Sequence, residues 1–158
     1  MSLHEALGVS QAVDTPYPNS PWVVLKFGGR SVSTAPNWTV IVQLIRDRLA
    51  EGVRPVIVHS ALVGVSNALI ALLDAAVAGG DTDEELGKIR AQHDALATEL
   101  GLDPDILRER FAALEQTVAG VKLVGEVSPR VHARVLSVGE LAATELGAAY
   151  LRSQGLDA

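Results

Sequence analysis

The chain has 158 residues, of which 48% are hydrophobic, enough for one globular domain with a core of its own. Its formal net charge is −6 and it has no run of basic residues, which argues against a nucleic acid or an anionic membrane as partner. The absence of cysteine excludes disulfides, thiolate metal sites and thiol catalysis, and no apolar stretch approaches the length of a membrane span.

Residues 1–21 predict a leader or linker outside the folded part. The opening "MSLHEALGVSQ" lacks the basic start and the long apolar core of a signal peptide, which favours a cytoplasmic protein. Its first letters, "MSL", are compatible with the remnant of an expression tag. The stretch "DTPYPNSP" is rich in proline and turn-forming residues and predicts an irregular segment. We therefore expect the folded part at residues 22–158.

Residues 22–59 predict a strand, a helix and a second strand. Trp22–Phe27 is a run of apolar and β-favouring residues that stops at Gly28, as expected of a buried strand, and Pro55–His59 predicts a second one. A helix between two strands with short connections is the unit of a parallel sheet. Ser33, Thr34 and Pro36 are start signals for this helix, and Gly52 ends it. Its apolar stripe is Trp38, Ile41, Ile45 and Leu49.

The rest of the sequence predicts helices. Residues 65–80 form an apolar helix that ends at two glycines, and the last helix of the chain ends at Gly155. Between them, two amphipathic helices are separated by Asp103-Pro104 and predict a helical hairpin, an excursion beside the sheet. The apolar stripes of the hairpin are Leu86, Ile89, His93, Leu96 and Leu100, and then Leu107, Phe111, Leu114 and Val118.

The histidines predict no metal site. They stand at positions 4, 59, 93 and 132, without the spacing of metal ligands. Because His93 lies in an apolar stripe, we expect it to be a packed, hydrogen-bonded residue of the core.

A first candidate site follows the first strand, in the stretch "KFGGRSV" at residues 26–32. The glycines Gly28 and Gly29 let backbone N–H groups approach a ligand closely, and the following helix start adds partial positive charge. Lys26 supplies a full positive charge, and together these features suit a phosphate group. The alternative is a tight turn with a lysine that extends into solvent, and the motif alone leaves both open. Neither the Walker motif nor GxGxxG is present.

A second candidate site follows the second strand. Ser60 stands where that strand ends, and Ser66 and Asn67 lie near the next helix start. Ligands collect outside the carboxyl ends of parallel strands, so Ser60 and Lys26 are expected at the same edge of the sheet. The alternative for Ser66 and Asn67 is ordinary helix capping. The stretch "GVSNA" half-matches the nucleophile elbow of hydrolases, but Ser66 stands several residues beyond the strand, which disfavours that interpretation.

A third candidate is Glu140, in the stretch "SVGEL". We expect Glu140 in the first turn of the last helix. There the helix dipole favours a carboxylate for structural reasons alone, and the functional alternative is a ligand for an ammonium group.

These stretches together resemble the aspartokinases of the amino acid kinase family. "KFGGRSV" resembles the family's KFGGTSV, and "VHSALVGVSNAL" resembles its VVSAMxGVTNxL. The hairpin with "IRAQHDAL" resembles the insertion that follows, and "SVGELAATELGAAYLRSQGLDA" resembles the family's S-F/H-G-E segment, its helix and the start of the next strand. The resemblance begins at about Trp22 and keeps the family's order. It implies an α/β fold with a mostly parallel sheet flanked by helices.

The resemblance implies that the longer protein phosphorylates the β-carboxylate of L-aspartate with ATP and Mg²⁺, the first step towards lysine, threonine and methionine. Lys26 would be the catalytic residue that stabilises the transferred phosphoryl group. The other implied site residues are Gly28, Gly29 and Ser31 at the ATP phosphates, Ser60 and Ser66 at the aspartate and phosphate pocket, and Glu140 at the substrate's α-ammonium group.

Two residues depart from the family pattern. Arg30 replaces a threonine and adds a bulky second cation, and Val138 replaces the aromatic residue or histidine before the Gly-Glu pair. The resemblance also implies that further aspartate ligands and the nucleotide-binding half follow Ala158. We therefore expect the N-terminal portion of a kinase domain, incomplete at its C-terminal end and inactive alone.

Two alternatives stay open. Another amino acid kinase, such as an acetylglutamate kinase, would share the fold, although the Lys-Phe-Gly-Gly start and the Gly-Glu helix argue against it. A degenerate member used as a binding or interaction module would account for Arg30. The resemblance further implies a homo-oligomer and is compatible with fusion to another lysine-pathway enzyme.

Overall fold

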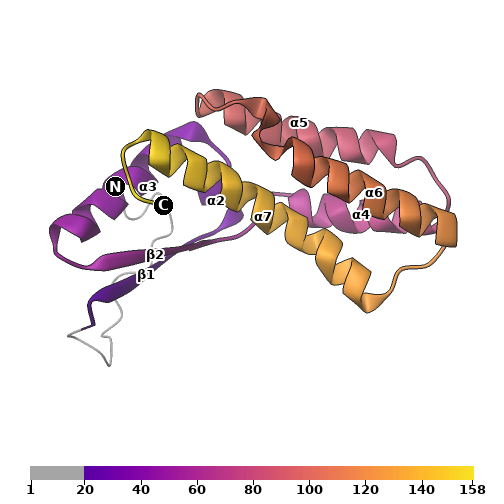
Figure 1. The fold of residues 1–158 in the computed structure, drawn as a ribbon, viewed down its shortest axis with the longest axis horizontal. Coiled ribbons are helices and arrows are strands. Elements are labelled where there is room, and N and C mark those ends of the chain that lie inside the picture. The colour runs from indigo at the N-terminus through magenta and orange to yellow at the C-terminus, as the bar shows by residue number, and fades with distance from the viewer. Residues whose placement is uncertain (1–19) are drawn as a thin grey trace.

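Two parallel strands form one end of the molecule in the computed structural model, which describes residues 20–158 (Figure 1). Strand β1 (Trp22–Phe27) pairs with β2 (Arg54–His59) in a register that runs from Trp22 opposite Arg54 to Phe27 opposite His59. Both predicted strands and their parallel pairing are confirmed. The proposed leader at residues 1–21 lies almost wholly outside the described residues.

Helix α3 (Ala35–Ala50) connects the strands as predicted and packs under the sheet through Trp38, Ile41 and Ile45, each 4% exposed or less. The prediction is wrong for Leu49, the fourth member of the apolar stripe, because its side chain is 46% exposed at the helix end. The sequence also missed a short helix, α2 (Gly29–Val32), directly after β1. Helical backbone thus stands where the sequence allowed a phosphate-binding glycine stretch or a tight turn.

The remaining helices form the other end of the molecule (Figure 1). They are α4 (Val65–Val77), α5 (Asp83–Glu99), a single 3-10 turn η1 (Pro104–Leu107), α6 (Arg108–Val124) and α7 (Pro129–Ser153). The predicted hairpin is confirmed as α5 and α6, and both pack against α4. Its apolar stripes meet in a core that includes Ile89, Leu96, Phe111 and Leu114. None of the helices in the described part is long and apolar enough to cross a bilayer.

Helix α7 joins the two ends because it is long enough to contact both (Figure 1). At the sheet end, Gly147 faces Trp38, and a Cβ atom at Gly147 would lie only 2.4 Å from the indole ring. Only two residues earlier in α7, Glu145 accepts from Nε of Arg110 in α6 at 3.0 Å, so neighbouring residues of α7 contact both parts. A side chain at residue 147 would therefore separate α7 from α3.

His93 is fully buried in the helical core. Its Nδ1–H donates to the carbonyl of Ile89 at 2.8 Å, and its ring meets Phe111 edge to face at 5.4 Å between centroids. Its Nε2 has no partner among the described atoms. The prediction of a packed, hydrogen-bonded core residue is confirmed, and burial lowers the pKa of His93 below 6.5.

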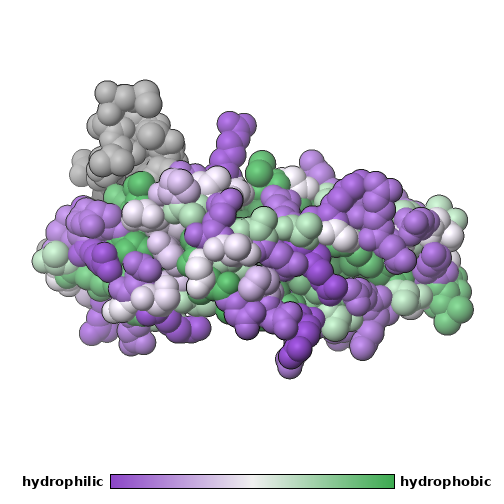
Figure 2. Space-filling view, turned by 90° about the horizontal axis from the view of Figure 1, so that it is seen from above, coloured by the Kyte–Doolittle hydropathy of each residue, from purple (hydrophilic) through white to green (hydrophobic). Residues whose placement is uncertain are grey.

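One face of the sheet is half-buried, apart from the buried Phe27, and the other face is exposed, which corrects the prediction of buried strands. Residues on the opposite face are exposed: Trp22 by 54%, Val24 by 64%, Val56 by 40% and Val58 by 45%. A second apolar area lies at the helical end, where green atoms gather in Figure 2 and where Leu123 at the end of α6 is 88% exposed.

We predict that the 158-residue chain self-associates through the exposed sheet face, because open strand edges and bare apolar surface favour association. Light scattering during gel filtration at micromolar concentration should give a mass above that of the monomer. Replacing Val24 and Val58 together by threonine should lower that mass, whereas Leu123→Thr, at the other end of the molecule, should not. A clean monomer with a cooperative thermal transition would contradict the prediction.

We also predict that His93 makes stability depend on pH. In the unfolded chain the imidazole takes up a proton near pH 6.5, but in the folded chain burial prevents this at the same pH. The unfolded state therefore binds more protons, and the free energy of unfolding should fall as pH drops below 6.5. His93→Gln should flatten this slope in urea titrations. The exposed His132→Gln is the control and should leave the slope unchanged.

Candidate functional site

The carboxyl ends of β1 and β2 lie side by side, because Phe27 pairs with His59 in the last register position. We call the segments that follow them, residues 28–34 and 60–64, the rim. The amide of Ser60 donates to the carbonyl of Phe27 at 3.3 Å and so continues the pairing past the strands. The prediction that Lys26 and Ser60 share one edge of the sheet agrees with this arrangement.

The two rim segments touch through backbone. A Cβ atom at Gly29 would lie 2.8 Å from the carbonyl oxygen of Ala61 and 3.3 Å from the amide nitrogen of Val63. Real Cβ atoms do not approach a carbonyl oxygen so closely, so Gly29 is needed for close packing rather than for a special backbone conformation. The second glycine of "KFGG" thus brings the segment after β1 against the segment after β2.

A second glycine contact brings α7 to the rim. A Cβ atom at Gly139 would lie 2.9 Å from Cβ of Ala61 and 3.0 Å from Cγ1 of Val65. Ala61 therefore contacts both the segment after β1 and helix α7. Three stretches that are far apart in the sequence meet at this one residue.

Lys26 is exposed at the end of β1. Its ammonium group lies over the rim, since a Cβ atom at Gly28 would be 3.9 Å from Nζ. Within the described residues neither Lys26 nor Arg30 forms a side-chain hydrogen bond or ion pair. Ser31, by contrast, is only 8% exposed, and its amide donates to the carbonyl of Gly28 at 2.9 Å. The end of β1 and the short helix α2 thus each carry one exposed cation, Lys26 and Arg30.

The serines after β2 occupy different environments. Ser60 is half-buried, and its Oγ donates to the carbonyl of Ala61 at 3.2 Å. Ser66 lies in the first turn of α4, whose N-cap is Gly64 with a φ of +84° and no side-chain cap bond. The capping explanation for Ser66 and Asn67 is therefore wrong. The hydrolase elbow is disfavoured as well, because Ser66 lies within a helix and not at the end of β2.

Glu140 does not lie in the first turn of the last helix. Helix α7 begins at Pro129, after the N-cap Ser128, whose Oγ accepts from the amide of Val131 at 3.3 Å. The pair Ser128-Pro129, a cap followed by a proline at the first helical position, sets the start of α7 eleven residues before Glu140. The helix dipole thus cannot account for Glu140. Its half-buried position follows Gly139, the residue that touches the rim.

Sequence reasoning missed Ser33 and Gln92. Ser33 had been predicted as a helix cap, but its Oγ donates to the carbonyl of Gly29 at 2.6 Å and accepts from the amide of Val63 at 3.0 Å. Gln92 of α5 donates from Nε2 to the carbonyl of Val63 at 3.0 Å. No spacing in the sequence signals these contacts, because the partners lie on different elements.

The described residues contain no group of three or more His, Asp or Glu side chains placed to hold a metal ion. An apolar cavity of about 610 Å³ lies between the sheet, α3 and α7, and its lining includes Trp22, Arg54 and Leu151. Trp22 and Arg54 begin their strands, so the cavity extends to the end of the sheet opposite the rim. The polar candidate residues are therefore not gathered around this cavity.

The family model described as "Amino acid kinase family" matches residues 21–158. The chain is 37% identical over 136 residues to aspartokinase 3, chloroplastic, of Arabidopsis thaliana, a match that covers 84% of this chain and 24% of that protein. It is 31% identical over 155 residues to the aspartokinase of Schizosaccharomyces pombe, covering 89% of this chain and 30% of that protein. The chain thus spans about a quarter of the length of the curated relatives it matches.

Solved structures agree with these matches. Aspartokinase III of E. coli with lysine and aspartate, in the T-state, superposes with a TM-score of 0.65 at 28% identity, over 87% of this chain and 30% of that one. The same enzyme with aspartate and ADP, in the R-state, gives 0.64 at 28% identity, over 84% and 29%. The expected fold is confirmed by this likeness.

We predict that Gly29→Ala destabilises the chain by about 1–3 kcal/mol, as overpacking against rigid backbone usually does. Gly120→Ala in α6 is the matched control, because a Cβ atom there meets nothing within 4 Å. It should stabilise the chain by about 0.5–1 kcal/mol through the better helix propensity of alanine. Urea unfolding of both variants measures the difference, and equal effects would show that the contact with Ala61 is loose.

Proposed function

Because the chain belongs to the amino acid kinase family, we propose that the longer protein containing it transfers the γ-phosphoryl group of ATP to the β-carboxylate of L-aspartate. The relatives named aspartokinase and the E. coli structures with aspartate and ADP support this reaction over others of the fold. An assay of ADP release with aspartate, and with acetylglutamate for comparison, tests the proposal. Release that depends on acetylglutamate alone would overturn it.

The observation that carries the proposal is the meeting of three segments at Ala61. Gly29, which precedes Ala61 in the sequence, and Gly139, which follows it, both contact this residue. The contacts bring together the end of β1, which bears Lys26, and the part of α7 that bears Glu140. A phosphoryl transfer to a carboxylate needs a cation at the transferred group and a separate group that orients the acceptor.

Lys26 has the position and the charge for the first role. Its ammonium group lies above Gly28 and is not neutralised by an acid of the described residues. A cation in this position stabilises the negative charge that the phosphoryl oxygens carry in the transition state. We assign Gly28, Gly29 and Ser31 to the binding of the ATP phosphates, with Ser31 acting from a buried position.

We assign Glu140, Ser60 and Ser66 to the aspartate side of the reaction. A carboxylate at Glu140 can bind the α-ammonium group of the substrate through a charge-assisted hydrogen bond. Ser60 directly follows β2, and Ser66 lies in the first turn of α4. Both stand at the same edge of the sheet. Together they would orient the β-carboxylate towards the γ-phosphate.

The finer parts of the assignment remain predictions. We propose that Mg²⁺ enters with the ATP phosphates, and the described residues offer it no ligand set of their own. Entry into lysine, threonine and methionine synthesis, assembly as a homo-oligomer, fusion to another lysine-pathway enzyme and a cytoplasmic location belong to the whole protein. Three of the relatives are chloroplastic by name, so the compartment does not follow from the family.

A second candidate function rests on Arg30. It is exposed, it directly follows Gly29, and it lacks an acidic partner among the described residues. A guanidinium at this place could occupy the phosphate position and leave a binding module without catalysis. ADP binding by the longer protein, measured by calorimetry, separates the two candidates, since the module would bind no nucleotide.

We predict that Lys26→Ala in the longer protein lowers kcat by about 10²–10³-fold, the usual loss when one charge that stabilises a transition state is removed. The control is Lys122→Ala on the exposed surface of α6, which should leave kcat unchanged. Steady-state kinetics with saturating ATP and aspartate gives the comparison. An unchanged kcat in Lys26→Ala would mean that the lysine is only a turn residue.

We predict that Glu140→Gln raises KM for aspartate by about 10–100-fold, since a charge-assisted hydrogen bond contributes about 1.5–3 kcal/mol. KM for ATP should change little, because the carboxylate is assigned to the amino acid. Glu126→Gln, in the exposed connection before α7, is the control. The assignment is wrong if ATP affinity is lost while aspartate affinity is kept.

A further inference from the structure

We propose that helix α5 positions the rim for nucleotide binding, and that Gln92 and Ser33 are the positioning residues. The inference rests on the proposed function in one respect, that the rim binds the phosphates of a nucleotide. The helical hairpin had been expected to be an excursion beside the sheet. Instead, α5 bonds the backbone of the second rim segment directly and is linked to the first through Ser33.

The peptide groups on both sides of Val63 are fixed by side chains from other elements. Its amide donates to Oγ of Ser33 at 3.0 Å, and its carbonyl accepts from Nε2 of Gln92 at 3.0 Å. Oγ of Ser33 donates in turn to the carbonyl of Gly29 at 2.6 Å. A continuous chain of hydrogen bonds therefore connects the segment after β1, the segment after β2 and helix α5.

A second contact joins α5 to the start of α3, just beyond the first rim segment. The carboxylate of Glu99 accepts from the amide of Ala35, the first residue of α3, at 3.4 Å. Gln92 and Glu99 are seven residues apart, so they lie on the same side of α5 about two turns from each other. One face of this helix therefore holds a backbone group after each strand.

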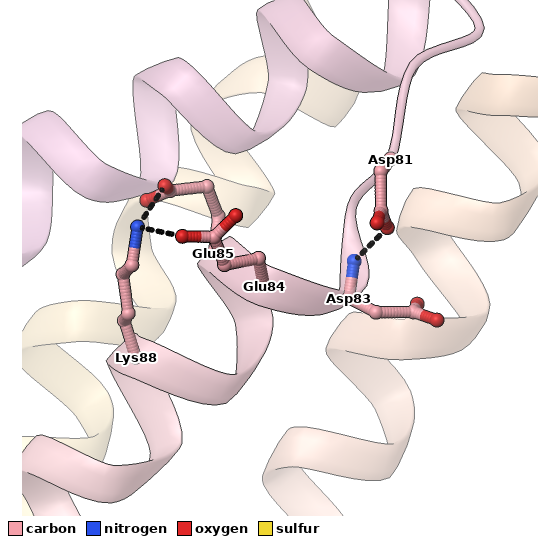
Figure 3. Close-up of polar contacts among 5 residues, drawn as sticks. All are labelled: Asp81, Asp83, Glu84, Glu85 and Lys88. Carbon is pink, nitrogen blue, oxygen red and sulfur yellow. Dashed lines mark hydrogen bonds and ion pairs between the residues drawn. The ribbon is translucent and has the colours of Figure 1, made fainter.

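Helix α5 is itself rigidly placed. Ile89 and His93 are buried in the helical core on either side of Gln92 in the sequence. At its start, Asp81 accepts from the amide of Asp83 at 2.9 Å, as Figure 3 shows. Lys88 meets Glu84 and Glu85 at 2.8 Å each, which adds ion pairs to the first turns of the helix (Figure 3).

The position of Val63 explains why this arrangement matters for binding. Val63 precedes Gly64, whose positive φ turns the chain into α4, and Ser66 follows within the first turn. Rotation of the peptide at Val63 would redirect the N–H groups at the start of α4. A phosphate site made of backbone groups binds tightly only when those groups are fixed beforehand.

The test uses Gln92→Leu in the longer protein and measures two quantities. Loss of one hydrogen bond should speed amide exchange at residues 62–65 by roughly five- to tenfold. The dissociation constant of ADP with Mg²⁺ should rise by a similar factor, with kcat and KM for aspartate changed less. Gln43→Leu is the matched control, because Gln43 donates to Asp47 on the exposed face of α3, away from the rim. It should leave both quantities unchanged.

A second pair of variants distinguishes loss of the specific hydrogen bond from a general loss of stability. Ser33→Ala removes the hydroxyl and should reproduce both effects, and Ser33→Thr keeps the hydroxyl and should restore ADP affinity. Unchanged exchange at residues 62–65 in Gln92→Leu would overturn the proposal. Faster exchange with unchanged ADP affinity would overturn it too, because the contacts would then be only structural.

The outcome for the proposed function can be read separately. A wild-type protein that binds ADP but does not phosphorylate aspartate refutes the reaction, while the variants still decide whether α5 positions the rim. A wild-type protein that binds no ADP overturns both the reaction and the positioning role.

Discussion

The arrangement of the candidate site depends on close packing around Ala61. Gly29 approaches its carbonyl oxygen from one side, and Gly139 approaches its Cβ from the other, and each contact leaves no room for a side chain. Packing at this density transmits displacement, since neighbouring atoms have no free space to relax into. A shift of α7 relative to the sheet would therefore move the segment after β2, and with it the relation between Lys26 and Glu140.

Helix α7 also needs a glycine at its second close contact, where it meets α3. Gly147 lies against the indole of Trp38, and Gly139 lies two turns earlier on the same side of the helix. The indole Nε1 donates to the carbonyl of Val32 at 2.9 Å, so Trp38 also fixes the end of α2. The sheet, α2 and α7 are thus placed by a few contacts in which glycine replaces a side chain.

Local sequence patterns predicted the elements well where a residue such as proline or glycine sets the end of the element. Strand β1 begins at Trp22, after Pro21, and ends at Phe27, before Gly28, and both ends were predicted from the sequence. The predictions failed where the answer depends on distant residues. Ser33 bonds a residue thirty positions away, and the exposure of Val24 and Val58 depends on what covers the sheet. The predicted place of Glu140 is wrong for a local reason, since the pair Ser128-Pro129 starts α7 well before it.

The charge of the chain poses an apparent conflict with the anionic substrates proposed above, ATP and aspartate. The sequence carries a net charge of −6, which would repel both ATP and aspartate at long range. At physiological ionic strength, however, exposed charges beyond about 8 Å are largely screened. The field at the rim is then set by the nearest groups, Lys26 and Arg30, which have no acidic partner among the described residues. An unpaired exposed cation loses no ion pair when it binds an anion. The rim can therefore attract phosphate in an acidic protein, and Arg30 contributes to that attraction even if it never touches the transferred group.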